Sequence, residues 1–85
     1  MSEEVVGKVT DYFAKIGVAA IQVTAGALNV GDTIRIKGHT TDLTQVVESI
    51  QLEHQGVQRA DAGQTVGIRV KDRVRKADTV LRVTP

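Results

Sequence analysis

The feature that most constrains this sequence is a glycine-rich turn followed directly by strict alternation of apolar and polar residues. Within residues 25–38, Gly31 and Asp32 end the turn, and Ile34 and Ile36 then alternate with polar neighbours. Alternation with a period of two is typical of a strand with one buried face. Gly31 can adopt positive φ and Asp32 can hydrogen-bond the backbone that follows, so the segment is predicted to reverse the chain between two strands.

The same pattern predicts further strands before and after this turn. They are expected at residues 5–13, 18–24, 33–38, 43–53, 64–71 and 79–83. The segment 64–71 has the clearest alternation, with Val66, Ile68 and Val70 facing inward. Within 43–53, Val47 and Ile50 are three residues apart, so a bulge or a strong bend must separate them.

Two strands have less regular patterns. In residues 5–13, Val5, Val9 and Phe13 are expected to share one face, with Val6 on the other. Ile16 and Val18 do not fit the alternation of residues 18–24, which predicts a bulge near Val18 or burial on both faces. In the last strand, Leu81 and Val83 are expected to face inward.

Composition supports an all-β fold. Valine and isoleucine dominate the apolar residues, and these β-branched side chains are favoured in strands. The single proline, Pro85, lies at the very end of the chain. We predict one domain over residues 1–85, with its core within about 5–83: a small closed antiparallel Greek-key β-barrel of about six to seven strands.

The chain shows no signal for export or membrane insertion. It has no cysteine, and acidic residues precede its first apolar residues where a signal peptide needs basic ones. No segment approaches the roughly 20 apolar residues of a membrane span. We expect a soluble cytoplasmic protein.

The net charge of +1 conceals an uneven distribution. Residues 1–61 carry a balance of −3 and residues 62–85 a balance of +4. The densest basic cluster contains Arg69, Lys71, Arg73, Arg75 and Lys76. Such side chains can contact phosphates, or they can simply be solvated charges of an exposed surface. Tyr12 and Phe13 are adjacent in an expected strand and so point to opposite faces, which leaves at most one of them as a stacking platform for bases.

No catalytic or metal site is predicted. His39 and His54 are the only histidines, and zinc needs three or four ligands. No serine, histidine and acid form a pattern that suggests a triad. We therefore predict a protein that is not an enzyme and holds no cofactor.

The order and spacing of several segments resemble the second domain of the translational GTPases, the β-barrel found in elongation factor Tu and initiation factor 2. These segments are Gly7–Val9, Gly26–Asp32, Val47 with Ile50, Ala62–Ile68 and Asp78–Leu81. Nothing matches the GxxxxGK[ST] motif, so no nucleotide is expected. The resemblance places two residues that cup the terminal adenosine of a transfer RNA at Gln51 and His54, and a third near the amino acid at Thr65.

This sequence departs from the elongation-factor pattern at all three positions, and at Ala77, where the family usually has glycine. The resemblance implies a noncatalytic module that binds RNA or a ribosomal or other component of the translation apparatus, through the basic cluster. Similar barrels also resemble the small β-domain appended to some collagenase-like peptidases. The alternative is therefore an accessory module with a protein partner, for example such a peptidase.

Overall fold

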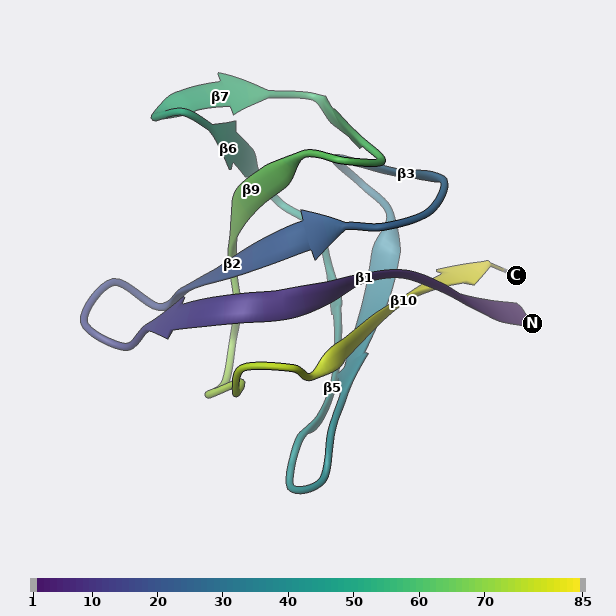
Figure 1. The fold of residues 1–85 in the computed structure, drawn as a ribbon, viewed down its shortest axis with the longest axis vertical. Helices are drawn as coiled ribbons and strands as arrows, with labels where there is room; N and C mark the ends of the chain where they lie inside the picture. Colours follow the sequence, from purple (N-terminus) through teal and green to yellow (C-terminus); the bar gives the residue numbers. More distant parts are fainter. Residues whose placement is uncertain (1, 85) are drawn as a thin grey trace.

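The computed structural model describes residues 2–84, which form ten strands in two antiparallel sheets and contain no helix (Figure 1). The strands are β1 Ser2–Phe13, β2 Val18–Val23, β3 Ala27–Asn29, β4 Thr33–Lys37, β5 Asp42–Val46, β6 Ile50–Leu52, β7 Gln55–Val57, β8 Arg59–Asp61, β9 Thr65–Arg69 and β10 Thr79–Thr84. Eight of them form one sheet in the order β5-β4-β10-β1-β2-β9-β6-β7, and β3 pairs with β8. The prediction of an all-β, antiparallel fold is confirmed.

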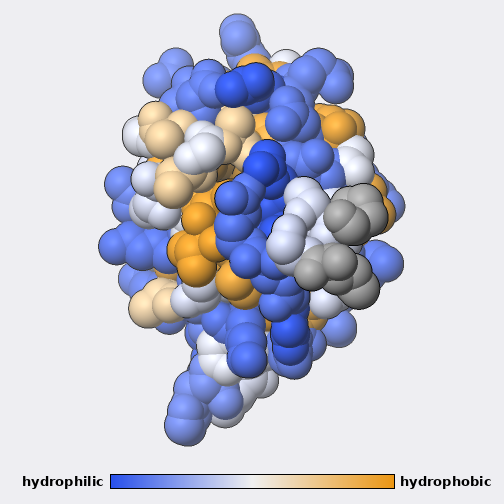
Figure 2. All heavy atoms as spheres, turned by 90° about the vertical axis from the view of Figure 1, so that its right-hand side faces the viewer, coloured by the Kyte–Doolittle hydropathy of each residue, from blue (hydrophilic) through white to orange (hydrophobic). Residues whose placement is uncertain are grey.

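The strands wrap around one apolar core. β2 buries Ala19, Ile21 and Val23, every second residue, as the alternation predicts. β9 does the same with Val66 and Ile68, and Val70 follows them into the core. Figure 2 shows that the face carrying the chain ends is mostly hydrophilic, with a limited apolar patch.

The sheet is not closed into a barrel, so the predicted closed barrel of six to seven strands is wrong. β5 pairs only with β4 and β7 pairs only with β6, which makes these two strands the edges. No strand pairing joins β5 to the end of β9, and the side chain of Gln45 connects them instead. The Gln45 amide nitrogen donates to the Arg69 carbonyl at 2.8 Å, and its oxygen accepts from the Lys71 N–H at 2.8 Å.

The predicted strand 43–53 is two strands at opposite ends of the sheet order. β5 lies beside β4, whereas β6 pairs with β9 and β7. The bend predicted between Val47 and Ile50 is present, and both side chains are buried. Residues 47–49 carry the chain from one edge region to the other, so the bend changes the strand's partner as well as its direction.

The two faces of β1 differ from the predicted alternation, which put Val6 and Val9 on opposite faces. Val6 and Val9 are buried, whereas Val5 and Phe13 are exposed. The register against β10 shifts between Val5 and Gly7, and the register against β2 shifts between Val9 and Asp11. These irregularities bring two residues that are three apart onto the same buried side, which simple alternation cannot do.

The inward face of β10 also differs from the prediction, because Val80 is buried while Leu81 and Val83 are only partly so. The pairing explains this. Val80 lies opposite the buried Ile36 of β4, whereas Leu81 lies opposite Arg35 and the exposed Val5. Just before β10, Ala77 has φ of 72°, a conformation that costs a non-glycine residue about 1–2 kcal/mol. That conformation explains why glycine suits this position better.

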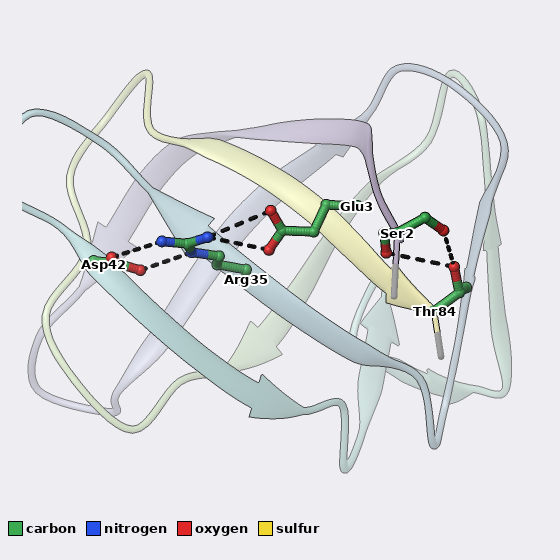
Figure 3. Close-up of polar contacts among 5 residues, drawn as sticks. All are labelled: Ser2, Glu3, Arg35, Asp42 and Thr84. Atoms are coloured by element: carbon green, nitrogen blue, oxygen red, sulfur yellow. Dashed lines mark hydrogen bonds and ion pairs between the residues drawn. The ribbon is translucent and has the colours of Figure 1, made fainter.

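An ion-pair group joins β1, β4 and β5 on the outer surface (Figure 3). The Arg35 guanidinium donates to both carboxylate oxygens of Asp42, at 2.9 and 2.8 Å, and to those of Glu3, at 3.3 and 3.2 Å. The hydrogen bonds that Arg35 donates lower the pKa of Asp42, and donating to Asp42 first and to Glu3 second raises the pKa of Arg35. The Ser2 and Thr84 hydroxyls are hydrogen-bonded at the neighbouring chain ends (Figure 3).

This lowered pKa predicts an acid-dependent contribution to stability. A carboxyl whose pKa falls on folding stabilises the folded state above its unfolded pKa, which is 3.8 for Asp42, and the contribution is lost as the pH falls through the folded value. Asp42→Asn should therefore lower the melting temperature at pH 7, and the difference from the wild type should shrink below about pH 4. Thermal unfolding at pH 7 and pH 2.5 measures this. A difference that grows in acid would contradict the ion-pair assignment.

Candidate functional site

A groove crosses the outer surface over β2, β9 and β6. It consists of two adjoining hollows of about 440 and 320 Å³. Both are lined by the same four residues, Ile16, Val18, Gln51 and Gly67, so they form one continuous depression. This groove is the candidate functional site.

Strand pairing builds the floor of the groove. Ala20 of β2 and Gln51 of β6 both lie opposite Gly67 of β9. Because β2 alternates, Val18 and Ala20 point outward while Ala19 and Ile21 fill the core. Gly67 has no side chain to fill the space, and a Cβ built there would lie 3.2 Å from Val18 Cγ1. The groove is therefore deep where the three strands meet.

One wall of the groove is apolar and unusually exposed. Phe13 is 48% exposed and Ile16 is 61% exposed, at the tight connection between β1 and β2. Large apolar side chains that lie together on a surface indicate an interaction site more strongly than scattered ones do. The predicted bulge near Val18 is absent from the β2 pairing. The irregular pattern of Ile16 and Val18 reflects their place in this wall.

The opposite wall includes a strained hairpin. Leu52 of β6 pairs with Gln55 of β7, so Glu53 and His54 form a two-residue loop, with φ of 51° and 66°. Loops with two positive φ values favour asparagine followed by glycine, and other residues pay a steric cost there. Both Glu53 and His54 line the groove. Non-glycine residues held in such conformations cluster at functional sites, which supports the choice of this groove.

The structure brings together the three positions that the translation-factor resemblance singled out. Gln51, His54 and Thr65 come from β6, the β6–β7 loop and β9, and all three line the second hollow. Phe13, Ile16 and Gly67, which also line the groove, were missed. The one available signal was the irregular pattern around Ile16, which the sequence analysis interpreted as a bulge or as burial on both faces.

The basic cluster is only partly at the groove. Arg69 lines the first hollow beside Glu48, whereas the rest of the cluster lies in the segment between β9 and β10. All five side chains are exposed. Among residues 2–84, the ion pairs involve Arg35, Arg59 and Arg82, so no ion pair neutralises the cluster. Arg69 therefore places an unpaired positive charge at one end of the groove.

Comparison with known proteins shows what the chain is similar to. It is 44% identical over 78 residues to a protein of Porphyromonas gingivalis named collagenase, covering 91% of this chain and 22% of that protein. It is 38% identical over 76 residues to an uncharacterised protease of Methanocaldococcus jannaschii, covering 88% of this chain and 18% of that protein. The chain thus spans about a fifth of the length of these relatives. No family model matches the chain.

Solved structures lead to the same group of proteins. The C-terminal domain of a protein from Geobacillus thermoleovorans described as a U32 peptidase superposes with a TM-score of 0.88 at 25% identity, covering 95% of this chain and 93% of that one. A selenomethionine variant of that domain gives a TM-score of 0.84 at 26% identity, covering 91% of this chain and 96% of that one. The predicted kinship with translation factors is wrong.

The relatives carry protease names and the structural neighbours are peptidase C-terminal domains. The prediction of an elongation-factor-like, RNA-binding protein is therefore overturned, and the similarity fits the alternative of a module of a collagenase-like peptidase. Over the described residues, no helix is long and apolar enough to cross a membrane. The cytoplasmic location and the absence of catalysis stay predictions.

Proposed function

We propose that this chain is a noncatalytic accessory module that works with a U32-peptidase-like protein body. The observation that carries the proposal is that almost the whole chain corresponds to almost the whole C-terminal domain of such a protein. The match to the collagenase, by contrast, covers a small share of that protein. A unit that recurs within larger proteins and also superposes as a whole domain has the properties of a module.

The side chains of the described residues support a noncatalytic role. Between residues 2 and 84, no three histidine, aspartate or glutamate side chains are grouped so that they could hold a metal ion. The groove contains Ser49 and His54, but they lie at opposite ends of the extended strand β6, and a serine nucleophile needs its base within hydrogen-bond reach. The groove is therefore better suited to binding than to bond cleavage.

A domain exchange tests the proposal. The 78-residue region of the Porphyromonas gingivalis collagenase that matches this chain is replaced by the chain itself, and a second version lacks the region altogether. We expect the deletion to lose most of the collagen cleavage of the intact protein and the exchange to restore at least about half of it. Collagen cleavage is measured at equal protein concentration.

The isolated chain is the control for a noncatalytic role. It should release no product from a fluorogenic peptide above the buffer rate. Turnover by the isolated chain would overturn the noncatalytic assignment. An exchange that folds but is no more active than the deletion would overturn the accessory role.

A further inference from the structure

We propose that the groove binds an extended peptide segment that carries apolar side chains followed by a carboxylate. The proposal rests on the proposed function for one point only, the choice of a peptide as the ligand class. The chemistry of the segment follows from the groove itself.

The shape of the groove fits an extended chain. Its two hollows adjoin across Gly67, where the missing side chain leaves the floor open. Phe13, Ile16 and Val18 form one wall, and burying an apolar side chain against them removes apolar surface from water. The two hollows are large enough to accept separate side chains of one extended segment.

The opposite wall can pair with a peptide backbone. Ser49, Gln51 and Thr65 are exposed and line the groove. Hydroxyl and amide side chains both donate and accept hydrogen bonds, as the N–H and C=O groups of a peptide require. One apolar wall facing one polar wall suits a segment that presents side chains to one side and backbone to the other.

The charge distribution predicts that the ligand carries a carboxylate and which way the ligand lies in the groove. Arg69 lines the first hollow and has no ion pair among residues 2–84. Guanidinium groups bind carboxylates by charge-assisted hydrogen bonds. The first hollow contains Arg69 together with one acid, Glu48, whereas the second contains Glu53 and neither arginine nor lysine, so an acidic residue of the ligand is favoured at the Arg69 end.

The groove lies away from the chain ends. The β1–β2 connection and the β6–β7 hairpin are on the side of the molecule opposite both termini (Figure 1). A chain joined at either terminus would therefore be attached on the side of the molecule opposite the groove.

Selection from a random dodecapeptide library displayed on phage, with the intact chain as bait, tests the proposal. We expect enriched peptides with one or two large apolar residues followed within a few positions by aspartate or glutamate. The consensus peptide is then synthesised with a fluorophore, and its Kd is measured by fluorescence anisotropy. Ile16→Lys and Arg69→Glu should each raise that Kd at least about tenfold.

Matched variants outside the groove serve as controls. Val46→Lys changes another exposed apolar residue, on β5, and Arg73→Glu reverses a charge of the same basic cluster. Both should change the Kd less than about twofold, and all four variants should keep the melting temperature of the wild type within a few degrees.

Several outcomes overturn the proposal. The proposal is wrong if no peptide is enriched or if the consensus has no acidic residue. It is also wrong if groove and control variants lose the same affinity for the peptide, or if an RNA oligonucleotide binds more tightly than the peptide. Peptide binding by the isolated chain together with a failed domain exchange would leave the groove assigned and the accessory role rejected. A successful domain exchange without peptide binding would reject the peptide-binding groove and leave the accessory role supported.

Discussion

Replacing Gly7 with alanine is expected to lower the free energy of unfolding by about 2–3 kcal/mol. The new Cβ would lie 2.5 Å from the backbone oxygen of Gln22 and 3.3 Å from Ile21 Cγ2. The nearer atom belongs to the backbone of β2, which is held in the ladder with β1, and cannot turn away as a flexible side chain would. The two strands must therefore separate locally, at a position next to the buried Val6.

Urea-induced unfolding measures this loss, which corresponds to a decrease in melting temperature of roughly 10–20 °C for a domain of this size. Gly56→Ala is the matched control, because nothing lies within 4 Å of its Cβ position and its φ is not positive. It should change the stability by less than about 0.5 kcal/mol. Equal losses in both variants would show that the close approach of β1 and β2 is not the cause.

The sequence was sufficient to predict the parts of the fold that depend on local pattern. Ile21 and Ile68 are buried because each lies in a strand with strict alternation. Gly31 and Gly63 have φ of 98° and 95°, as turns at these positions require. Alternation and glycine act within a few residues, and such effects can be read without knowing which segments become neighbours.

Features that depend on distant partners were not predictable in this way. β3 and β8 have three residues each, and their pairing joins Leu28 to Ala60 across the whole middle of the chain. Val6 turns inward because the register between β1 and β10 shifts there, and that shift depends on the last strand. The alternation of Leu81 and Val83 fits either face equally well, and only the pairing of Val80 with Ile36 selects one.

The sequence analysis singled out three residues of the candidate site but did not predict their role. Gln51, His54 and Thr65 are far apart in sequence, and a resemblance was needed to group them; the groove holds all three although the inferred kinship is wrong. The exposure of Ile16 left only an irregular pattern in the sequence, and that pattern alone does not distinguish an exposed isoleucine from a buried one. Surface sites of this kind become visible only when the strands are assembled.

Replacing Gln45 with alanine is expected to lower the free energy of unfolding by about 2–4 kcal/mol. The side chain is 6% exposed and satisfies two backbone groups, the Arg69 carbonyl and the Lys71 N–H. Removing it leaves a donor and an acceptor without partners. An unsatisfied buried group costs about 1–3 kcal/mol, and these two part-buried groups are expected in the lower part of that range. It also removes the connection that these two hydrogen bonds make between edge strand β5 and the end of β9. Urea unfolding gives the size of the effect, and faster hydrogen exchange of the Lys71 amide locates it.

Two further variants distinguish the effect of the Gln45 hydrogen bonds from that of ordinary packing. Thr44→Ala, at the neighbouring exposed position of β5, should cost no more than about 0.5 kcal/mol. Gln45→Glu keeps an acceptor for Lys71 but directs a carboxylate at the Arg69 carbonyl. We expect burial beside that carbonyl to raise the pKa of the introduced carboxyl above its unfolded value of about 4.3. A group with a raised folded pKa stabilises the folded state at low pH and loses that contribution as the pH rises. The loss of stability of Gln45→Glu relative to the wild type should therefore be smaller at pH 4 than at pH 7, whereas that of Gln45→Ala should change little with pH. A loss of stability of Gln45→Glu that does not vary with pH would mean that the donor to Arg69 does not join the two strands.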